Sequence, residues 1–179
     1  MRRRPADPRA VQPAHASDQD RVGLVICVIE HLRGHPIEQA GVARPPRPWR
    51  PCQTAICPAD LGFLPGTLGR QDQSLDMFVL GDQHRGPGEL ALVYPVGAVD
   101  VRFPTVDTTV LVGLTPPPSR LIAPAAQLSR VPEEARAELG CFLTSLAGRE
   151  PVHLAWRDRA AATQEIATSR TLFQEADHE

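Results

Sequence analysis

Apolar residues in the first two thirds of the chain gather in short runs that predict β-strands. The first run, VGLVICVI at 22–29, is continuous and rich in Val and Ile, as in a buried strand. Further runs at 77–80, 89–103 and 108–114 are bounded by turn residues, and a PVG break divides 89–103 into two predicted strands. The gaps between the runs from 77 to 114 are too short for crossover helices, so an antiparallel sheet is expected.

The C-terminal third has the periodicity of amphipathic helices. Pro132 suits a first helical position, and Glu133 and Glu134 fall in the first turn, where the helix dipole favours acids. Gly148 is expected to end this helix. A second helix is expected from about Asp158 to Ala176, and the two helices predict a hairpin packed on the sheet. One face of the first helix carries Ala135, Leu139, Phe142, Leu143 and Leu146.

Three segments lack any sustained period. Residues 1–20 are polar and are expected to be disordered, 41–74 predicts a coil rich in Pro and Gly, and 115–127 predicts a proline-rich connector. The rest of the chain, residues 21–179, is long enough for a single α+β domain. The predicted fold class is α+β: a small antiparallel sheet of about four to five short strands with a C-terminal helical hairpin, plus long proline-rich irregular segments.

The composition reports on the genome more than on a function. All 19 basic residues are arginine, and neither lysine nor asparagine occurs in the 179 residues. Lysine is a common exposed residue and asparagine a favoured turn and cap residue, so protein chemistry gives no reason to exclude them. Both have A-rich codons, which a GC-rich bacterial genome avoids. Long open frames also arise by chance in such genomes. The function is therefore left open at this point, and one hypothesis is a predicted reading frame with no selected biochemical function.

Charge and cysteine usage exclude several classes of protein. A formal charge of −2 gives no general attraction to nucleic acid or to an anionic membrane. No apolar stretch approaches the length of a membrane span, and no secretory signal is recognisable. The four cysteines do not make a disulfide framework, and Cys27 and Cys141 are expected to be small buried apolar residues. We therefore expect a soluble cytoplasmic protein without a nucleic-acid or membrane partner.

One set of side chains has the spacing of zinc ligands. His31 and His35 form H-x3-H, and Cys52 and Cys57 form C-x4-C. Imidazole nitrogens and thiolates are the ligands of closed tetrahedral zinc sites, so zinc is the candidate cofactor of a small intracellular binding module. The alternative is two surface histidines and two unpaired thiols, because C-x4-C is looser than the common spacing and Gly34 interrupts any helix between the histidines.

A proline repeat lies between the two pairs of candidate ligands. Pro45, Pro48 and Pro51 recur every third residue, which matches one edge of a polyproline II helix, and PPRPWR fits a P-x-x-P-x-R peptide ligand. Residues 45–51 are therefore the candidate contact for a protein partner. The alternative is a stiff exposed linker, because a chain rich in proline and arginine produces this pattern by chance.

A third interpretation is a small hydrolase-like enzyme. Asp82 and His84 lie in the GDQHRG turn, where a histidine beside a carboxylate can act as a general base. Glu89, Asp100 and Asp107 also flank the predicted strands. No G-x-S-x-G elbow accompanies them, and without lysine there is neither a Ser–Lys pair nor a P-loop. A polar hairpin turn is the simpler interpretation, so the sequence assigns no catalytic residue.

Overall fold

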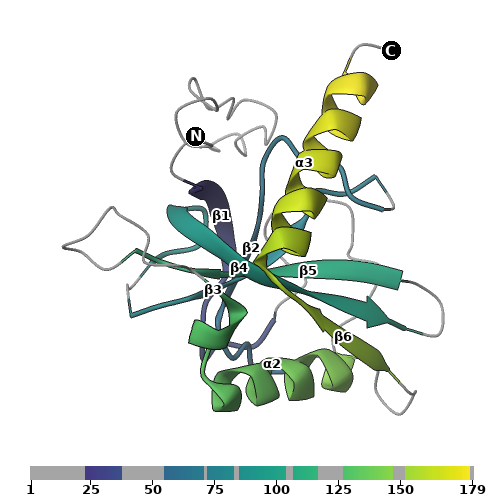
Figure 1. The fold of residues 1–179 in the computed structure, drawn as a ribbon. Helices are drawn as coiled ribbons and strands as arrows, with labels where there is room; N and C mark the ends of the chain where they lie inside the picture. The colour runs from purple at the N-terminus through teal and green to yellow at the C-terminus, as the bar shows by residue number, and fades with distance from the viewer. Residues whose placement is uncertain are drawn as a thin grey trace, which may run out of the picture.

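The fold is mixed α+β, with one six-stranded sheet and two α-helices packed against it (Figure 1). This computed structural model describes residues 23–37, 55–70, 72–82, 85–103, 107–116, 127–146 and 152–177. The sheet order is β1-β2-β3-β5-β4-β6. The strands are β1 (Val25–His31), β2 (Asp60–Phe63), β3 (Asp76–Leu80), β4 (Leu90–Arg102), β5 (Asp107–Leu114) and β6 (His153–Arg157); the helices are the 3-10 turn η2 (Leu128–Arg130), α2 (Glu133–Leu146) and α3 (Arg159–Ala176).

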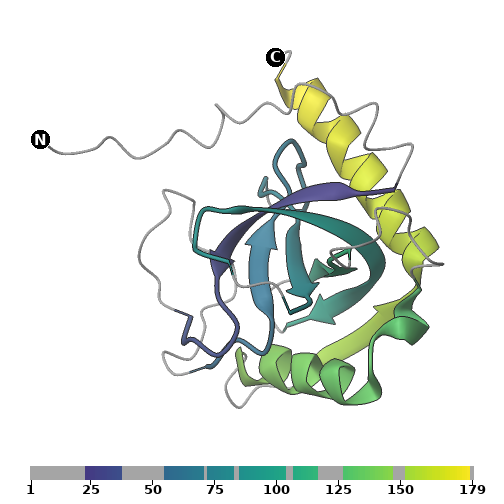
Figure 2. The same cartoon turned by 90° about the vertical axis from the view of Figure 1, so that its left-hand side faces the viewer.

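The sheet closes on itself, because β1 pairs with β4 as well as with β2. Strands β1, β2, β3, β5 and β4 therefore form a closed barrel, and β6 adds an outer strand along β4. The length of β4 allows three pairings: residues 90–93 lie beside β1, and the later residues lie between β5 and β6. Figure 2 shows the strands curving around a common centre. Closure leaves fewer unpaired strand edges than an open sheet would.

The pairing of β3 with β5 is parallel, whereas the other described pairs are antiparallel. The expectation of a purely antiparallel sheet is therefore wrong for this pair. The reason is that β3 and β5 are neighbours in space but not in sequence. The whole of β4 lies between them, which is a connection long enough for a parallel return.

The predicted break at PVG is a local irregularity within a single strand. β4 runs unbroken over 13 residues, and its register with β5 shifts between Pro95 and Gly97. Proline cannot donate to a ladder, so a bulge is a position where a strand tolerates it. Gly97 is required there, since a Cβ would lie 2.7 Å from the Arg157 carbonyl oxygen of β6. The sheet consequently has more and longer strands than the four to five short ones expected.

The segment expected to be an irregular coil contains β2. This strand has only four residues, which is too short for a period to be recognised. An isolated bridge joins Pro36 to Ile56, and the Ile37 N–H donates to the Ala55 carbonyl at 3.1 Å. Residues 1–20 and 38–54 and most of 115–127 lie outside the described residues, so the expectations for them stay predictions.

Both predicted helices form, but they do not form a hairpin. α2 covers 14 residues and α3 covers 18, and the strand β6 separates them in the chain. Figures 1 and 2 show α2 and α3 on different sides of the sheet. Asp158 caps α3, because its side chain accepts the Ala161 N–H at 2.9 Å. β6 was missed because none of its side chains is buried, which leaves no clear alternation.

Apolar residues form two core clusters on opposite faces of the strands. One lies between the sheet and α2, where the rings of Phe78 and Phe142 meet edge to face with centroids 5.8 Å apart. The other includes Met77 of β3 and receives Ala162 and Ile166 of α3. The α2 residues buried in the first cluster are the predicted stripe residues Leu139, Phe142, Leu143 and Leu146.

Candidate functional site

A buried ion pair lies at the start of β2. The Arg85 Nη1 is 3.5 Å from the Asp60 Oδ2, and the two side chains are 6% and 12% exposed. Asp60 Oδ1 also accepts the Arg33 backbone N–H at 2.9 Å. The Asp60 carboxylate therefore joins three segments: the turn after β1, the start of β2 and the segment that precedes β4. A charge held at this depth requires partners of this kind.

The buried Cys27 thiol on β1 lies within the electrostatic reach of this pair. Burial is the largest cause of its raised pKa, followed by the carboxylates of Asp76 and Glu30. The Arg85 guanidinium acts in the opposite direction, and Asp60 raises the pKa again. A thiol with a raised pKa is a poor nucleophile and a poor metal ligand. Three carboxylates and one guanidinium thus act electrostatically on an inert thiol.

Asp76 is a buried carboxylate, 8% exposed, at the first position of β3. The preceding loop is ordered by the Thr67 hydroxyl, which donates to the Leu64 carbonyl at 2.6 Å and accepts the Leu75 N–H at 3.0 Å. Because strand side chains alternate, Asp76 lies on the same face as Phe78, which is the face towards α2. Asp76 and Asp60 were not singled out from the sequence. The available signal was an acid directly preceding a short apolar run, as in DMFVL and DLGF.

A second polar group crosses three neighbouring strands. Asp100 of β4 accepts the Thr109 hydroxyl of β5 at 2.8 Å, and Arg157 Nη1 of β6 lies 3.3 Å from its Oδ2. Asp100 is opposite Thr109 in the register with β5 and opposite Ala155 in the register with β6. The Arg157 and Asp100 side chains are 38% and 40% exposed, so solvent screens this pair.

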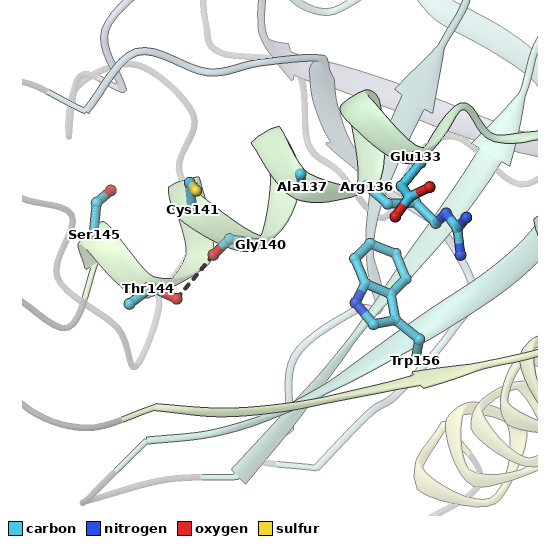
Figure 3. Close-up of a pocket in the computed structure, with 8 residues that line it drawn as sticks. All are labelled: Glu133, Arg136, Ala137, Gly140, Cys141, Thr144, Ser145 and Trp156. Carbon is cyan, nitrogen blue, oxygen red and sulfur yellow. Dashed lines mark hydrogen bonds between the residues drawn. The ribbon is translucent and has the colours of Figure 1, made fainter.

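A groove of about 750 Å³ lies between α2 and β6 (Figure 3). Figure 3 shows Arg136 and Glu133 above the indole of Trp156, with Cys141 farther along the helix. Arg136 Nε is buried and has no hydrogen-bond partner within the described ranges. Cys141 is exposed, so the expectation that it is buried is wrong; its position is on the solvent side of α2. The groove is lined by Glu133, Arg136, Ala137, Gly140, Cys141, Thr144, Ser145 and Trp156.

The structure brings together two of the four candidate zinc ligands. The Cys57 N–H donates to the His35 carbonyl at 2.9 Å, so these residues are neighbours. The Cys57 thiol is buried and donates to the Ala59 carbonyl at 2.9 Å, whereas His35 is exposed. His31 is half-buried at the end of β1, and Cys52 lies outside the described residues. The zinc site therefore stays a prediction.

The other sequence-based candidates lie partly or wholly outside the described ranges. Asp82 is exposed in the turn after β3, and His84 is not described. The proline repeat at 45–51 is not described either, so a contact with a protein partner stays a prediction. No helix in the described part of the chain is long and apolar enough to cross a membrane.

Comparison with known proteins identifies a family. Residues 47–174 match the family model of inorganic pyrophosphatase. A search of curated proteins found no match. The fold is similar to an inorganic pyrophosphatase from Thermus thermophilus, with 24% identity and a TM-score of 0.73 over 94% of this chain and 99% of that one. An inorganic pyrophosphatase from Helicobacter pylori is 17% identical, with a TM-score of 0.67 over 86% and 95%. One from Neisseria gonorrhoeae is 16% identical, with a TM-score of 0.71 over 94% and 99%.

The family match corrects the interpretation of the chain as a hypothetical reading frame without a selected function. It equally replaces the alternative of a small interaction module. The composition was misleading because codon bias acts on selected and unselected frames alike, so the exclusion of lysine carries no information about selection. The positions of the apolar residues are informative, since they close a barrel that other proteins share across nearly their whole length.

Proposed function

We propose a function from one premise, which is that this chain belongs to the inorganic pyrophosphatase family: the family model matches residues 47–174, more than half of the chain. The proposed reaction is hydrolysis of inorganic pyrophosphate. Water attacks one phosphorus atom, the bridging P–O bond breaks, and two phosphates are released. The observation that carries this proposal is the family match itself, which covers the chain from β2 into α3.

The basic residues of the chain suit a pyrophosphate ligand. All 19 basic residues are arginine. Codon bias accounts for this uniform choice, so only the chemistry of the guanidinium group supports the proposal. A guanidinium presents planar, paired donors that match two phosphate oxygens at once and keeps its charge at any physiological pH. Charge neutralisation of this kind supports both binding of the anion and stabilisation of the charge that develops during phosphoryl transfer.

The acidic residues suit a resident metal less well. Enzymes of phosphoryl transfer commonly hold Mg²⁺ through carboxylates, and the metal then neutralises the phosphate oxygens. Within the described ranges, no group of three or more His, Cys, Asp or Glu side chains is placed to hold a metal ion. Asp60 and Asp100 instead bind arginines. The residues that the structure describes therefore do not fit a resident metal.

A second candidate function is binding of pyrophosphate without hydrolysis. The observation that favours it is the pairing of Asp60 with Arg85 and of Asp100 with Arg157. A carboxylate whose oxygens are occupied by a guanidinium is poorly placed to act as a general base on water. Arginine can neutralise the anion, but it cannot accept the proton of an attacking water.

The two candidates are separated by measuring turnover and binding on the same preparation. The full chain is incubated with pyrophosphate and MgCl2, and phosphate release is followed by colorimetry. Binding of imidodiphosphate, in which nitrogen replaces the bridging oxygen, is measured by calorimetry. Gly113→Val, purified in parallel, is the control for host pyrophosphatase, because a side chain at 113 would overlap Val93 in the core. Release above this control supports hydrolysis. Binding of imidodiphosphate without release of phosphate supports the second candidate. If the chain shows neither binding nor release, both candidate functions are contradicted.

A further inference from the structure

Several carboxylates of the barrel strands are already paired with arginine. A divalent metal such as Mg²⁺ needs oxygen ligands gathered around one point, and its charge is repelled by any cation already bound to those oxygens. A carboxylate that already binds a cation is a poor metal ligand. Whether the carboxylates are occupied in this way therefore decides whether the protein can bind a metal before the substrate. Three of the described carboxylates on the sheet are paired with arginine: Asp60, Asp100 and Asp107.

Asp60 is the most deeply engaged of the three. One oxygen faces the Arg85 guanidinium and the other accepts the Arg33 N–H. A metal at Asp60 would have to displace a guanidinium whose side chain is only 6% exposed. That exchange takes the Asp60 carboxylate away from a buried cation, which costs several kcal/mol.

Asp100 and Asp107 lie farther along the sheet and are also occupied. Asp100 accepts the Thr109 hydroxyl and binds Arg157, while Asp107 lies 3.4 Å from the Arg102 Nε. These pairs are more exposed than that of Asp60 and are correspondingly weaker. Their carboxylates nevertheless point to separate arginines, so they do not converge on one point.

The residues in register with Asp76 on the neighbouring strands are apolar. In the register of the sheet, Asp76 is opposite Phe63 of β2 and Val110 of β5. The next positions on the same face are Phe78 and Val112, which belong to the apolar cluster under α2. The side chains in register with Asp76 therefore supply no further oxygen ligands.

We infer that the described part of this chain holds no resident divalent metal, and that the metal reaches the protein only as its complex with pyrophosphate. This inference rests on pyrophosphate being the ligand, as proposed above. The pyrophosphate oxygens supply the metal ligands, and arginines bind the remaining negative charge. Acidic residues outside the described ranges are Asp7, Asp18, Asp20, Glu38, Glu150 and Glu179, so the test uses the full chain.

The test measures binding of Mn²⁺, a paramagnetic substitute for Mg²⁺, by electron paramagnetic resonance. The signal of free Mn²⁺ is titrated with the full chain, first alone and then with saturating imidodiphosphate. The expected result is no loss of free Mn²⁺ signal with protein alone at metal concentrations up to about 1 mM, which spans the weaker range of protein sites for hard cations. With imidodiphosphate, added protein should bind Mn²⁺ beyond the amount that the ligand sequesters in buffer.

Each result of the two Mn²⁺ titrations either supports or contradicts the inference. Stoichiometric binding of Mn²⁺ by the protein alone overturns it, and loss of that binding in Asp76→Asn or Glu38→Gln would locate the site. If the protein binds no Mn²⁺ either with or without imidodiphosphate, the second half of the inference is wrong, because it requires a ternary complex of protein, metal and imidodiphosphate. These readouts do not depend on turnover. A chain that releases no phosphate contradicts hydrolysis while leaving the metal result to be judged separately.

Discussion

Arg85 and Asp60 form an ion pair that is almost completely removed from solvent, with the Nη1 and Oδ2 atoms 3.5 Å apart. The pair connects the segment before β4 to the first residue of β2, and the Arg33 N–H adds the turn after β1. Both charges lose their hydration on folding, so the pair contributes less net stability than the Coulomb attraction alone suggests. Its main effect is geometric, since it fixes three chain segments against one another.

The variant Arg85→Met is expected to lower the free energy of unfolding by about 3 kcal/mol, because it leaves the Asp60 carboxylate buried without its cation. The double variant Arg85→Met with Asp60→Asn should recover part of this loss, since the amide is neutral and its oxygen can still accept the Arg33 N–H. Urea unfolding followed by circular dichroism measures both. A double variant less stable than Arg85→Met would show that the uncompensated charge is not the cause.

The contact between β3 and α2 should depend on a single aromatic pair. Phe142→Ala removes the ring that meets Phe78 edge to face and leaves a cavity beneath α2, so we expect a loss of about 3 kcal/mol in the free energy of unfolding. Thr144→Ala on the exposed side of the same helix is the matched control and should change stability by less than about 0.5 kcal/mol. Equal losses in the two variants would mean that α2 is not held by this contact.

The elements with strong local signals were predictable from the sequence. β1, β3, β5 and both helices follow from apolar runs or a helical stripe, and the burial of Leu139, Phe142, Leu143 and Leu146 follows from their spacing. β2 and β6 were not predictable, because they have four and five residues and gain their stability from neighbouring strands. The parallel pairing of β3 with β5 depends on contacts between segments distant in sequence, which no local pattern encodes.

The polar groups were harder to predict than the fold. Asp100 and Asp107 were noted at strand ends, but their arginine partners are chosen by strand register. Asp60 pairs with Arg85, which lies 25 residues later in the chain, because closure of the barrel brings the two residues together. The family itself was not recognised, because the residues quoted from the sequence as candidate chemistry form no metal or nucleophile motif within the described ranges.

The two thiols Cys27 and Cys141 should differ sharply in reactivity. Cys27 is buried, and burial together with nearby carboxylates raises its pKa, whereas Cys141 is exposed on α2. Thiolate is the reactive form, so a disulfide reagent at pH 8 should label Cys141 at least tenfold faster than Cys27. Peptide mapping after short exposures identifies the labelled sites, and Cys141→Ser should remove the fast phase. Fast labelling that persists in Cys141→Ser and maps to Cys27 would contradict its burial.

The raised pKa of Cys27 also predicts a dependence of stability on pH. The unfolded thiol ionises near pH 8.5, while the folded thiol retains its proton at that pH. Stabilisation from the protonated thiol is therefore fully present below about pH 8.5 and is lost as the pH rises, at roughly 1.4 kcal/mol per pH unit. The stability difference between the native chain and Cys27→Ala should shrink between pH 8 and pH 10. A constant difference across this range would contradict the raised pKa.

Gly113 is the position where the core should tolerate no side chain. It lies on β5 between β3 and β4, and a Cβ there would overlap the Val93 Cγ1 and approach the Met77 sulfur to 3.1 Å. Gly113→Ala is therefore expected to lower the free energy of unfolding by about 2 kcal/mol through overpacking. Val93→Ala removes the atom in conflict, so the double variant should lose less stability than the sum of the two single variants. Urea unfolding of the native chain, both single variants and the double variant gives the coupling energy. Strictly additive losses would show that the backbone of β5 relaxes away from β4, and that close approach of the two strands does not require glycine at 113.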